Sequence, residues 1–358
     1  MNKSQWCQYL TTQQAQFCPN DSNIITSFAD SNPQESKQTA SITPLLYQGL
    51  LSISGPDSAK FLQGQLSCDV HSASPQHSLL GAACSPQGRM FSSFRLLQKN
   101  SDTEAEFILR MRNDLVTTTH ETLHKYSVFF KTQLKNASDE WLGLGIWGEQ
   151  CEQLISETFG LDEIPQQVGE VSTNETAIVI RLAGETPRFE CWCKAEKTTA
   201  LWTELITQAS PTATDRWILE DIQQGIGELC HATQDTFNPH MLNFQAIDAI
   251  SFDKGCYTGQ EIIARTHYRG KSKRHMQRFS LCGGEPLAPG TELYDADSNK
   301  TIATVVSSAV VNQQERQQEQ QALLVSNVGL DTSSPLTLQA DEQRYTATLL
   351  PLPYTLDS

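Results

Sequence analysis

The stretch Lys254-Gly255-Cys256-Tyr257-Thr258-Gly259-Gln260-Glu261 decides how the whole chain is interpreted. Within it, Thr258 and Glu261 have the T-x-x-E spacing of a capping box, in front of an apolar pair. This spacing predicts a helix that starts at Gly259, with Cys256 just before its N-terminal cap. A helix N-terminus carries a partial positive charge, which favours a thiolate. The pattern therefore predicts a reactive or ligand-binding cysteine; the alternative is a cysteine buried at a helix start.

A basic island contains this stretch and continues beyond it. From residue 254 to residue 278 one acidic residue, Glu261, stands against seven basic ones: Lys254, Arg265, Arg269, Lys271, Lys273, Arg274 and Arg278. The whole chain has 41 acidic and 26 basic residues and a formal charge of −15. That charge argues against bulk electrostatic capture of nucleic acid or an anionic membrane. The island is either a local site for an anionic ligand or a short piece of nucleic acid, or a solvated face.

Two strand–glycine–helix units lie upstream, about 90 residues apart. Residues 50–54 read as a strand, Gly55 as a turn and residues 58–65 as a helix. The plan returns with a strand over 142–147, a turn at Gly148 and a helix over 149–159. The repetition predicts two similar α/β halves. The second strand also contains a G-x-G-x-x-G pattern, but its first two glycines fall inside the strand, so the pattern predicts a tight turn rather than a nucleotide site.

The two ends of the chain differ in texture from this middle part. After about residue 275 come short β-rich runs, at 277–281, 301–311, 321–327 and 345–350, which predict a small barrel or sandwich. Residues 312–320 (NQQERQQEQ) between two of these runs read as a solvated loop. Residues 1–40 are rich in Gln, Ser, Asn and Thr, and we expect a weakly structured extension there.

Length and composition set outer limits. A chain of 358 residues suggests two or three domains. It contains no run of 18 apolar residues and no apolar segment typical of a secretory signal near its start, so the cytoplasm is the expected location. The ten cysteines include no C-x-x-C pair, which makes a disulfide framework or a tetrahedral metal site an unfavoured interpretation.

The stretch 254–261 matches a specific signature, K-G-C-[FY]-x-G-Q-E. In this the sequence resembles the YgfZ proteins, folate-binding relatives of the glycine-cleavage T-protein, an aminomethyltransferase. The resemblance extends from about residue 45 to the C-terminus. It continues in Gln63-Gly64-Gln65-Leu66-Ser67-Cys68-Asp69-Val70, Gln87-Gly88-Arg89-Met90, Phe237-x-Pro239, Asn243-Phe244-Gln245, Ala264-Arg265, Arg269-Gly270 and Pro351-Leu352-Pro353-Tyr354.

The resemblance implies an α+β, T-protein-like fold. Two similar α/β halves would surround a central folate cavity and precede a small C-terminal β-barrel. On the numbering of this chain, the folate-binding region would span residues 41–275, as subdomains of about 41–140 and 141–275. The barrel would span 276–358, and the extension 1–40 lies outside the resemblance.

The resemblance also implies a function: a folate-dependent accessory protein that supports iron–sulfur enzymes and thereby tRNA modification. Its partners would be tetrahydrofolate or another folate and iron–sulfur enzymes such as the tRNA methylthiotransferase. No stable nucleic-acid complex and no membrane partner is expected, and the chain would be a monomer. Cys256 would be the functional thiol, redox-active or a transient cluster ligand in the absence of a fixed metal site, and its neighbours in the signature are Lys254, Gly255, Gly259, Gln260 and Glu261.

Of the folate contacts that the resemblance implies, some fall on residues that differ from those of the family. One family tryptophan falls at Trp217, which on pattern alone would be a core residue of a helix. A second falls at Gln48, so that Tyr47 beside it would have to stack on the ligand instead. The glutamate with which T-protein relatives bind the pterin falls at Gln223, which loses the charge. Asn243 and Arg269 complete the set, with Arg269 near the glutamyl tail.

A further departure concerns catalysis. Aminomethyltransferases carry an acidic pair soon after the hairpin turn, and here those positions are Ser92-Ser93. A serine cannot supply the carboxylate that orients or deprotonates the folate nitrogen. We therefore expect no turnover by the chain itself. Two alternatives stay open: a tetrahydrofolate-dependent one-carbon transferase, and a direct tRNA-binding module that uses residues 254–278.

Overall fold

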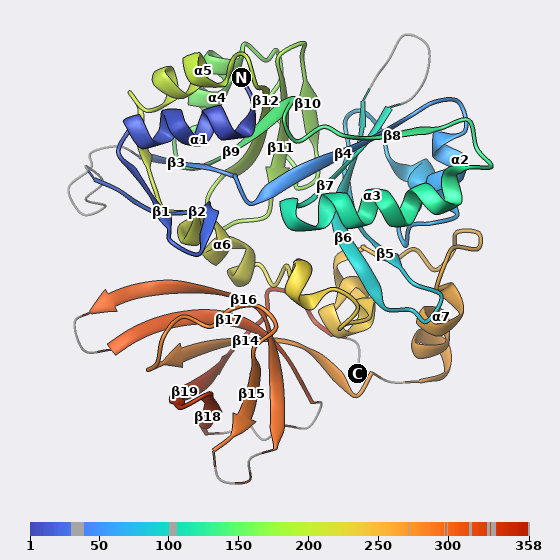
Figure 1. The fold of residues 1–358 in the computed structure, drawn as a ribbon, viewed down its shortest axis with the longest axis vertical. Coiled ribbons are helices and arrows are strands. Elements are labelled where there is room, and N and C mark those ends of the chain that lie inside the picture. The colour runs from blue at the N-terminus through green and yellow to red at the C-terminus, as the bar shows by residue number, and fades with distance from the viewer. Residues whose placement is uncertain are drawn as a thin grey trace. The chain divides into compact units, whose positions relative to one another are not determined.

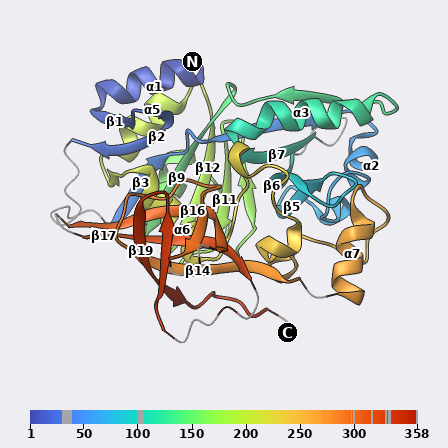
Figure 2. The same ribbon diagram turned by 60° about the horizontal axis from the view of Figure 1, so that its bottom comes forward.

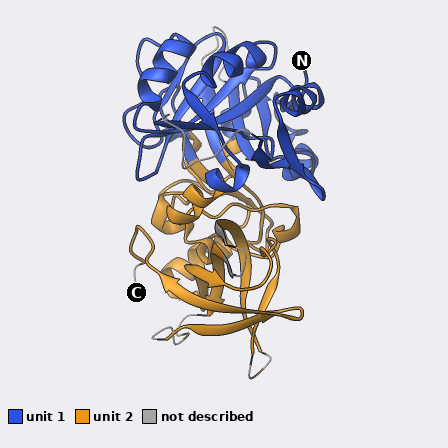
Figure 3. Ribbon diagram, turned by 90° about the vertical axis from the view of Figure 1, so that its left-hand side faces the viewer, with its two compact units in different colours: residues 1–61, 71–79, 95–217 blue, residues 62–70, 80–94, 218–358 orange. Residues whose placement is uncertain are grey.

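The architecture is seen in a computed structural model. It describes residues 1–356 except 30–38, 100–105, 271, 297, 299, 315–316, 328–329 and 331–333, and for 312–318 only the backbone is considered. The chain divides into two compact units, each made of separate stretches (Figure 3). Unit 1 comprises residues 1–61, 71–79 and 95–217, and unit 2 comprises 62–70, 80–94 and 218–358.

The first sheet belongs to unit 1 and is centred on β9 (Trp141–Gly148), whose apolar run is buried as far as Ile146 (Figure 1). Its strand order is β10-β11-β12-β9-β3-β13, and only the β3–β13 pair is parallel. At the end of β9, Gly148 turns the chain with a φ of +114°. The other elements are β10 (Val171–Thr173), β11 (Ala177–Leu182), β12 (Arg188–Lys194), β3 (Ala40–Pro44), β13 (Ala209–Pro211), and the helices α4 (Cys151–Phe159) and α5 (Thr198–Leu205).

The second sheet has the order β5-β6-β7-β4-β8, and its β6 strand passes from one unit into the other. The long helix α3 (Asn113–Ser127) packs on β4 and β8 through its apolar stripe (Figure 1). The strand β4 leads through Gly55, with a φ of +119°, into α2 (Ser58–Gln63), so both predicted strand–glycine–helix units are confirmed. The strands are β4 (Gln48–Ser54), β5 (Leu79–Cys84), β6 (Met90–Lys99), β7 (Glu106–Arg112) and β8 (Gln133–Asn136).

The two sheets do not follow the predicted division at residue 140. The strand β3 comes from the predicted first half, yet it pairs with β9 of the second half over residues 40–44. A parallel contact then adds β13 outside β3. The predicted α+β class with T-protein-like halves is confirmed, but β3, from the predicted first half, belongs to the sheet of the second half.

Unit 2 ends in a closed barrel of six strands, in the order β14-β17-β16-β15-β18-β19 (Figure 1). Figure 2 shows β14, β16, β17 and β19 of this barrel from another side. Its core includes Phe279, Leu293, Val305, Leu324 and Tyr345. The predicted C-terminal barrel is thus confirmed. The strands are β14 (Arg274–Cys282), β15 (Glu292–Asp295), β16 (Thr301–Gln314), β17 (Gln317–Asn327), β18 (Leu336–Ala340) and β19 (Gln343–Leu350). Before the barrel lie η2 (His231–Thr233), η3 (Pro239–Leu242), η4 (Phe244–Ile247) and α7 (Gln260–Arg269), while α6 (Thr214–Gln223) spans both units and η1 is Val70–Ser72.

The predicted solvated loop over 312–320 is wrong for most of its length. The strands β16 and β17 continue through it, with Gln313 paired to Gln318 and Gln314 to Gln317. Polar composition suggested a loop, but backbone hydrogen bonds extend a hairpin whatever side chains it carries.

The expectation of a weakly structured N-terminus is also wrong, for residues 1–29. They form α1 (Lys3–Thr12), β1 (Ala15–Cys18) and β2 (Asp21–Phe28), and residues 30–38 lie outside the described part. A capping box between Asn2 and Gln5 starts the helix. Trp6 is fully buried and lies edge-on to Trp202, at 5.7 Å between ring centroids. A few apolar side chains at helical spacing decide the structure of a segment whose composition is polar.

Among the helices of the described residues, none is long and apolar enough to cross a membrane.

Candidate functional site

The signature loop lies in unit 2, between η4 and α7. The helix begins at Gln260, one residue after the predicted start, and its N-cap is Gly259. The predicted capping box is wrong, because the Thr258 hydroxyl does not cap the helix. It donates instead to Gln65 Oε1 at 3.3 Å, and the Thr258 N–H donates to the Gly64 carbonyl at 3.1 Å. The threonine therefore ties the loop to residues 64–65.

The two glycines of the loop have different roles. Gly259 has a φ of +85°, and a Cβ there would lie 2.6 Å from the Ser85 carbonyl oxygen. Only glycine fits that position without strain. A Cβ on Gly255 would meet nothing within 4 Å. Gly259 is needed for the fold of the loop, while Gly255 leaves open space beside Cys256.

Lys254 is bound to the protein interior rather than to the thiol. Its Nζ donates to the carbonyls of Leu66 and Cys68, both at 2.7 Å, and lies 5.0 Å from the centroid of the Tyr257 ring. Burial lowers the pKa of Lys254 to about 8, and burial also raises the pKa of the Tyr257 hydroxyl above its usual value. The lysine therefore fastens the loop to residues 66–68.

Cys256 stands out from the other cysteines by its exposure. Of the ten, six are buried and two half-buried, and only Cys256 and Cys282 are exposed. Cys256 lies three residues before the N-cap Gly259, and therefore outside the first turn of α7. Among the described residues, no group of three or more His, Cys, Asp or Glu side chains could hold a metal ion.

Gln260 and Glu261, the last two residues of the signature, form the first turn of α7. Gln260 is half-buried and Glu261 is exposed. The signature is thus one local structure: its lysine and threonine are anchored to residues 64–68, and its cysteine is presented to solvent.

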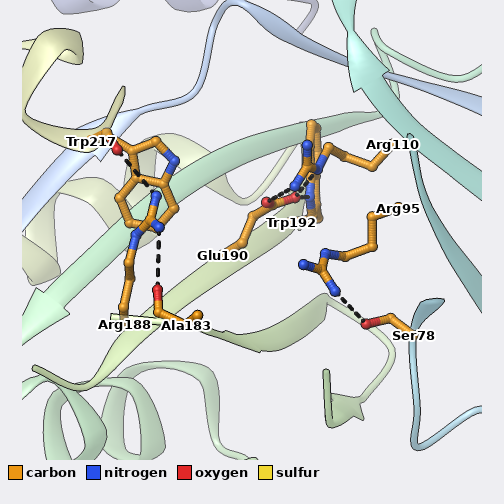
Figure 4. Close-up of polar contacts among 8 residues, drawn as sticks. All are labelled: Ser78, Arg95, Arg110, Ala183, Arg188, Glu190, Trp192 and Trp217. Carbon is orange, nitrogen blue, oxygen red and sulfur yellow. Dashed lines mark hydrogen bonds and ion pairs between the residues drawn. The ribbon is translucent and has the colours of Figure 1, made fainter. Parts of the chain in front are cut away.

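Two of the predicted folate contacts, Trp217 and Tyr47, lie in unit 1. Trp217 is 1 % exposed, and the guanidinium of Arg188 lies 3.8 Å from its ring centroid (Figure 4). Gly145 approaches the same ring so closely that a Cβ would lie 2.5 Å away from it. Tyr47 is 3 % exposed, with Arg112 at 4.7 Å from its ring. Both rings are therefore packed by the protein's own groups.

The other predicted contacts, Gln223, Asn243 and Arg269, lie in unit 2. Gln223 is the last residue of α6, and its backbone carbonyl accepts from Arg278. Asn243 is fully buried and donates to the Met276 carbonyl at 2.8 Å, so its visible contacts are structural. Arg269 is exposed at the end of α7. The structure does not bring the five predicted contacts together within one unit.

Sequence reasoning missed a charged cluster inside unit 1. Glu190 of β12 is 1 % exposed and forms an ion pair with Arg110 of β7, at 2.9 Å (Figure 4). The Trp192 indole N–H donates to the same carboxylate at 2.6 Å. Arg95, also buried, donates to the Ser78 hydroxyl at 3.0 Å. The signal in the sequence was the alternation of Arg188 and Glu190 with apolar residues at the start of a strand that stays apolar until Lys194.

Several known proteins are similar to this chain in sequence. The chain is 33% identical over 314 residues to the tRNA-modifying protein YgfZ of Edwardsiella ictaluri, covering 86% of this chain and 90% of that protein. It is 30% identical over 334 residues to the YgfZ protein of Pectobacterium carotovorum, covering 92% and 96%. This chain belongs to the YgfZ family.

No protein-family model matches the sequence. Among solved structures, the glycine cleavage system aminomethyltransferase T from Bartonella henselae matches with a TM-score of 0.76 at 15% identity, over 97% of this chain and 96% of that one. This likeness shows the fold. The predicted resemblance of the sequence to YgfZ proteins, and their T-protein-like architecture, are both confirmed.

In this YgfZ protein the basic island is not one continuous charged surface. Arg274 donates to the Val325 carbonyl at 3.1 Å and Arg278 to the Gln223 carbonyl at 2.9 Å, as Lys254 does to Leu66. Arg265, Arg269 and Lys273 are exposed, and Lys271 lies outside the described residues. About half of the island therefore stabilises the fold.

Proposed function

We propose that this YgfZ protein is a cytoplasmic folate-binding accessory protein that supports iron–sulfur enzymes, and through them tRNA methylthiolation, with Cys256 as its functional thiol. The observation that carries the proposal is the signature loop. Its anchoring by Lys254, Thr258 and Gly259 holds an exposed cysteine in a defined place, whereas six of the other cysteines are buried. An exposed thiol on an ordered scaffold is suited to act on a partner.

The thiol would act together with groups that a client enzyme supplies. The described residues offer no second and third ligand with which Cys256 could hold a metal by itself. A transient contact to a client's cluster, or thiol chemistry with the client, needs only one exposed cysteine.

Folate is proposed to bind at the charged cluster of unit 1. A pterin presents N–H groups that pair with a carboxylate, and the glutamyl tail presents carboxylates that pair with guanidinium groups. Glu190 supplies the buried carboxylate, and Arg95, Arg110 and Arg188 supply buried guanidinium groups. The chemistry of this set fits a folate. We therefore propose Glu190, rather than Gln223, as the acidic partner of the pterin.

One-carbon transfer by the chain itself is the disfavoured alternative. Ser92 and Ser93 are both buried, and the Ser93 hydroxyl accepts a hydrogen bond from the Leu229 N–H at 2.8 Å. These positions contribute hydroxyl groups to the packing of unit 2, and they hold no carboxylate that could act as a base.

The role of the thiol is tested in a deletion strain. We expect Cys256→Ala to lose tRNA methylthiolation and Cys282→Ala, the matched exposed cysteine in the barrel, to retain it. Methylthiolated tRNA is measured by mass spectrometry of nucleosides. If Cys256→Ala supports the modification as well as the wild type, the thiol has no such role.

Folate binding is tested by calorimetry with tetrahydrofolate. We expect binding to the wild type, much weaker binding to Glu190→Gln and unchanged binding to Glu152→Gln, a partly exposed carboxylate paired with Arg181. Because Glu190→Gln leaves Arg110 buried without its charge partner, its folding is checked by circular dichroism. A rise of the wild-type melting temperature with tetrahydrofolate is an independent readout of binding. Absence of both heat and shift in the wild type would remove folate from the proposal.

A further inference from the structure

The exposed side of α7 carries an unusual set of residues for a chain with a charge of −15. Arg265, Tyr268 and Arg269 have i, i+3 and i+4 spacing and so lie on one side of the helix. All three are exposed, and Tyr268 is 66% exposed. We call these three residues the α7 face. Lys273 is also exposed and follows four residues later.

The tyrosine of the α7 face is the outer member of an aromatic cluster. His267 lies parallel to Phe252, with 3.7 Å between ring centroids and 13° between planes. Tyr268 packs edge-on against His267 at 4.8 Å and against Phe252 at 6.1 Å. His240 continues the cluster inward, 6.2 Å from His267 and nearly parallel to it. The Tyr268 ring is therefore held in place from one side while most of its surface stays open to solvent.

The charge around this ring is positive. Of the seven basic residues of the island, Lys254, Arg274 and Arg278 donate to backbone carbonyls. The exposed basic residues are Arg265, Arg269 and Lys273. The exposed acidic residues are Glu261 within the island and Asp253 directly before it. A fixed aromatic ring between guanidinium groups is the arrangement that binds single-stranded nucleic acid, because any base can stack on the ring while the cations contact phosphates.

We propose that the α7 face binds a single-stranded segment of RNA, with a base stacked on Tyr268 and phosphates held by Arg265, Arg269 and Lys273. An acidic protein surface would use the same cations, but it would gain little from an exposed aromatic ring that is packed edge-on against two others. The net charge of −15 does not prevent such binding, since at physiological salt charges beyond about 8 Å are largely screened.

This site is separate from the functions proposed above. It uses neither the charged cluster of unit 1 nor the Cys256 thiol. Cys256→Ala and Glu190→Gln, if folded, should therefore bind RNA like the wild type, whatever their effects on tRNA modification or on folate.

The test is fluorescence anisotropy of the full chain with a labelled 12-nucleotide single-stranded RNA. We expect Tyr268→Ala to weaken binding about 5- to 150-fold, which is the range for loss of one stacked base, and Tyr268→Phe to bind like the wild type. Arg265→Glu with Arg269→Glu should abolish binding. The matched controls are Tyr126→Ala and the double variant Lys125→Glu with Lys131→Glu, which alter exposed residues in and just after α3 of unit 1 and should change nothing.

Three results would overturn the proposal. The first is no saturable binding by the wild type at 0.1 M salt. The second is equal loss in the α7 variants and in the unit 1 controls. The third is loss with the arginine variants alone, unchanged by Tyr268→Ala and matched by an equally charged poly-glutamate peptide, which would assign the face to acidic proteins instead.

Discussion

At the scale of single residues, the signature loop separates residues that build the site from those that use it. Lys254, Thr258 and Gly259 face inward and fix the loop to two neighbouring segments. Gly255 and Cys256 face solvent. The signature thus contains three residues that fix the loop and two that face solvent. We expect substitutions in the first group to lower stability and substitutions in the second group to leave it unchanged.

The two glycines give a matched pair of variants. Gly259→Ala should lower the free energy of unfolding by at least about 2 kcal/mol, because an alanine is strained at a φ of +85° and its Cβ meets the Ser85 carbonyl. Gly255→Ala meets no atom and should stay within about 0.5 kcal/mol. Urea denaturation followed by tryptophan fluorescence measures both. Equal stabilities of the two variants would contradict this account of the loop.

Lys254 should leave a signature in the pH dependence of stability. Its pKa is about 8 in the folded chain and about 10.4 in an unfolded one, so between these values the unfolded state binds more protons. Stability contributed at this site therefore rises with pH from about 8 to about 10. The difference in unfolding free energy between wild type and Lys254→Met should rise across this window. Lys254→Arg is the control: its side chain stays charged throughout, so the difference in unfolding free energy between Lys254→Arg and Lys254→Met should not change with pH. If the difference between wild type and Lys254→Met does not change with pH, the lysine is not desolvated in the folded chain.

At the scale of elements, the N-terminal segment is the main surprise. The helix α1 and the β1–β2 hairpin contribute Trp6, Leu10, Ile25 and Phe28 to the core of unit 1 around Trp202. The Tyr9 hydroxyl also bonds to Thr203 of α5 at 3.0 Å. The segment is part of the folded unit, and its removal should expose apolar surface on the first sheet's helices.

A single side chain tests this contribution. Trp6→Ala should cost about 3–5 kcal/mol of stability, because it opens a cavity at a fully buried position. Gln8→Ala, exposed on the same helix, is the control and should cost less than about 0.5 kcal/mol. Chemical denaturation measures both variants. A Trp6→Ala protein as stable as the control would mean that α1 is only loosely attached.

At the scale of the whole molecule, the chain's units are assembled from distant stretches. Unit 2 contains residues 62–70 and 80–94 together with everything after residue 217. Its C-terminal tail returns to the start of this last stretch, where the Tyr354 hydroxyl donates to the Gly225 carbonyl at 2.8 Å and accepts from Asn243 at 3.3 Å. The tail thus closes unit 2 onto itself.

Loss of this closure is measurable. Tyr354→Phe removes both hydrogen bonds and should lower the stability of the chain by about 1–3 kcal/mol, since the Gly225 carbonyl then loses its partner. Tyr294→Phe is the control and should be near neutral, because the hydroxyl of Tyr294 bonds to Glu292 and Thr301, which are both exposed in the barrel. Thermal unfolding of the two variants makes the comparison. Equal effects would show that the tail is not a structural tie.

The sequence by itself determined the fold class, the C-terminal barrel, both strand–glycine–helix units and the family. The fold class, the barrel, the strand–glycine–helix units and the family follow from local patterns and from an eight-residue signature, because the residues that carry them are close together in the sequence. Tertiary structure alone decided that Glu190 pairs with Arg110, 80 positions apart along the chain, that Trp217 is covered by Arg188, and that Lys254 is bound to residues 66–68. A buried charge is stable only beside partners that folding delivers from elsewhere in the chain, and no local pattern specifies which residue arrives.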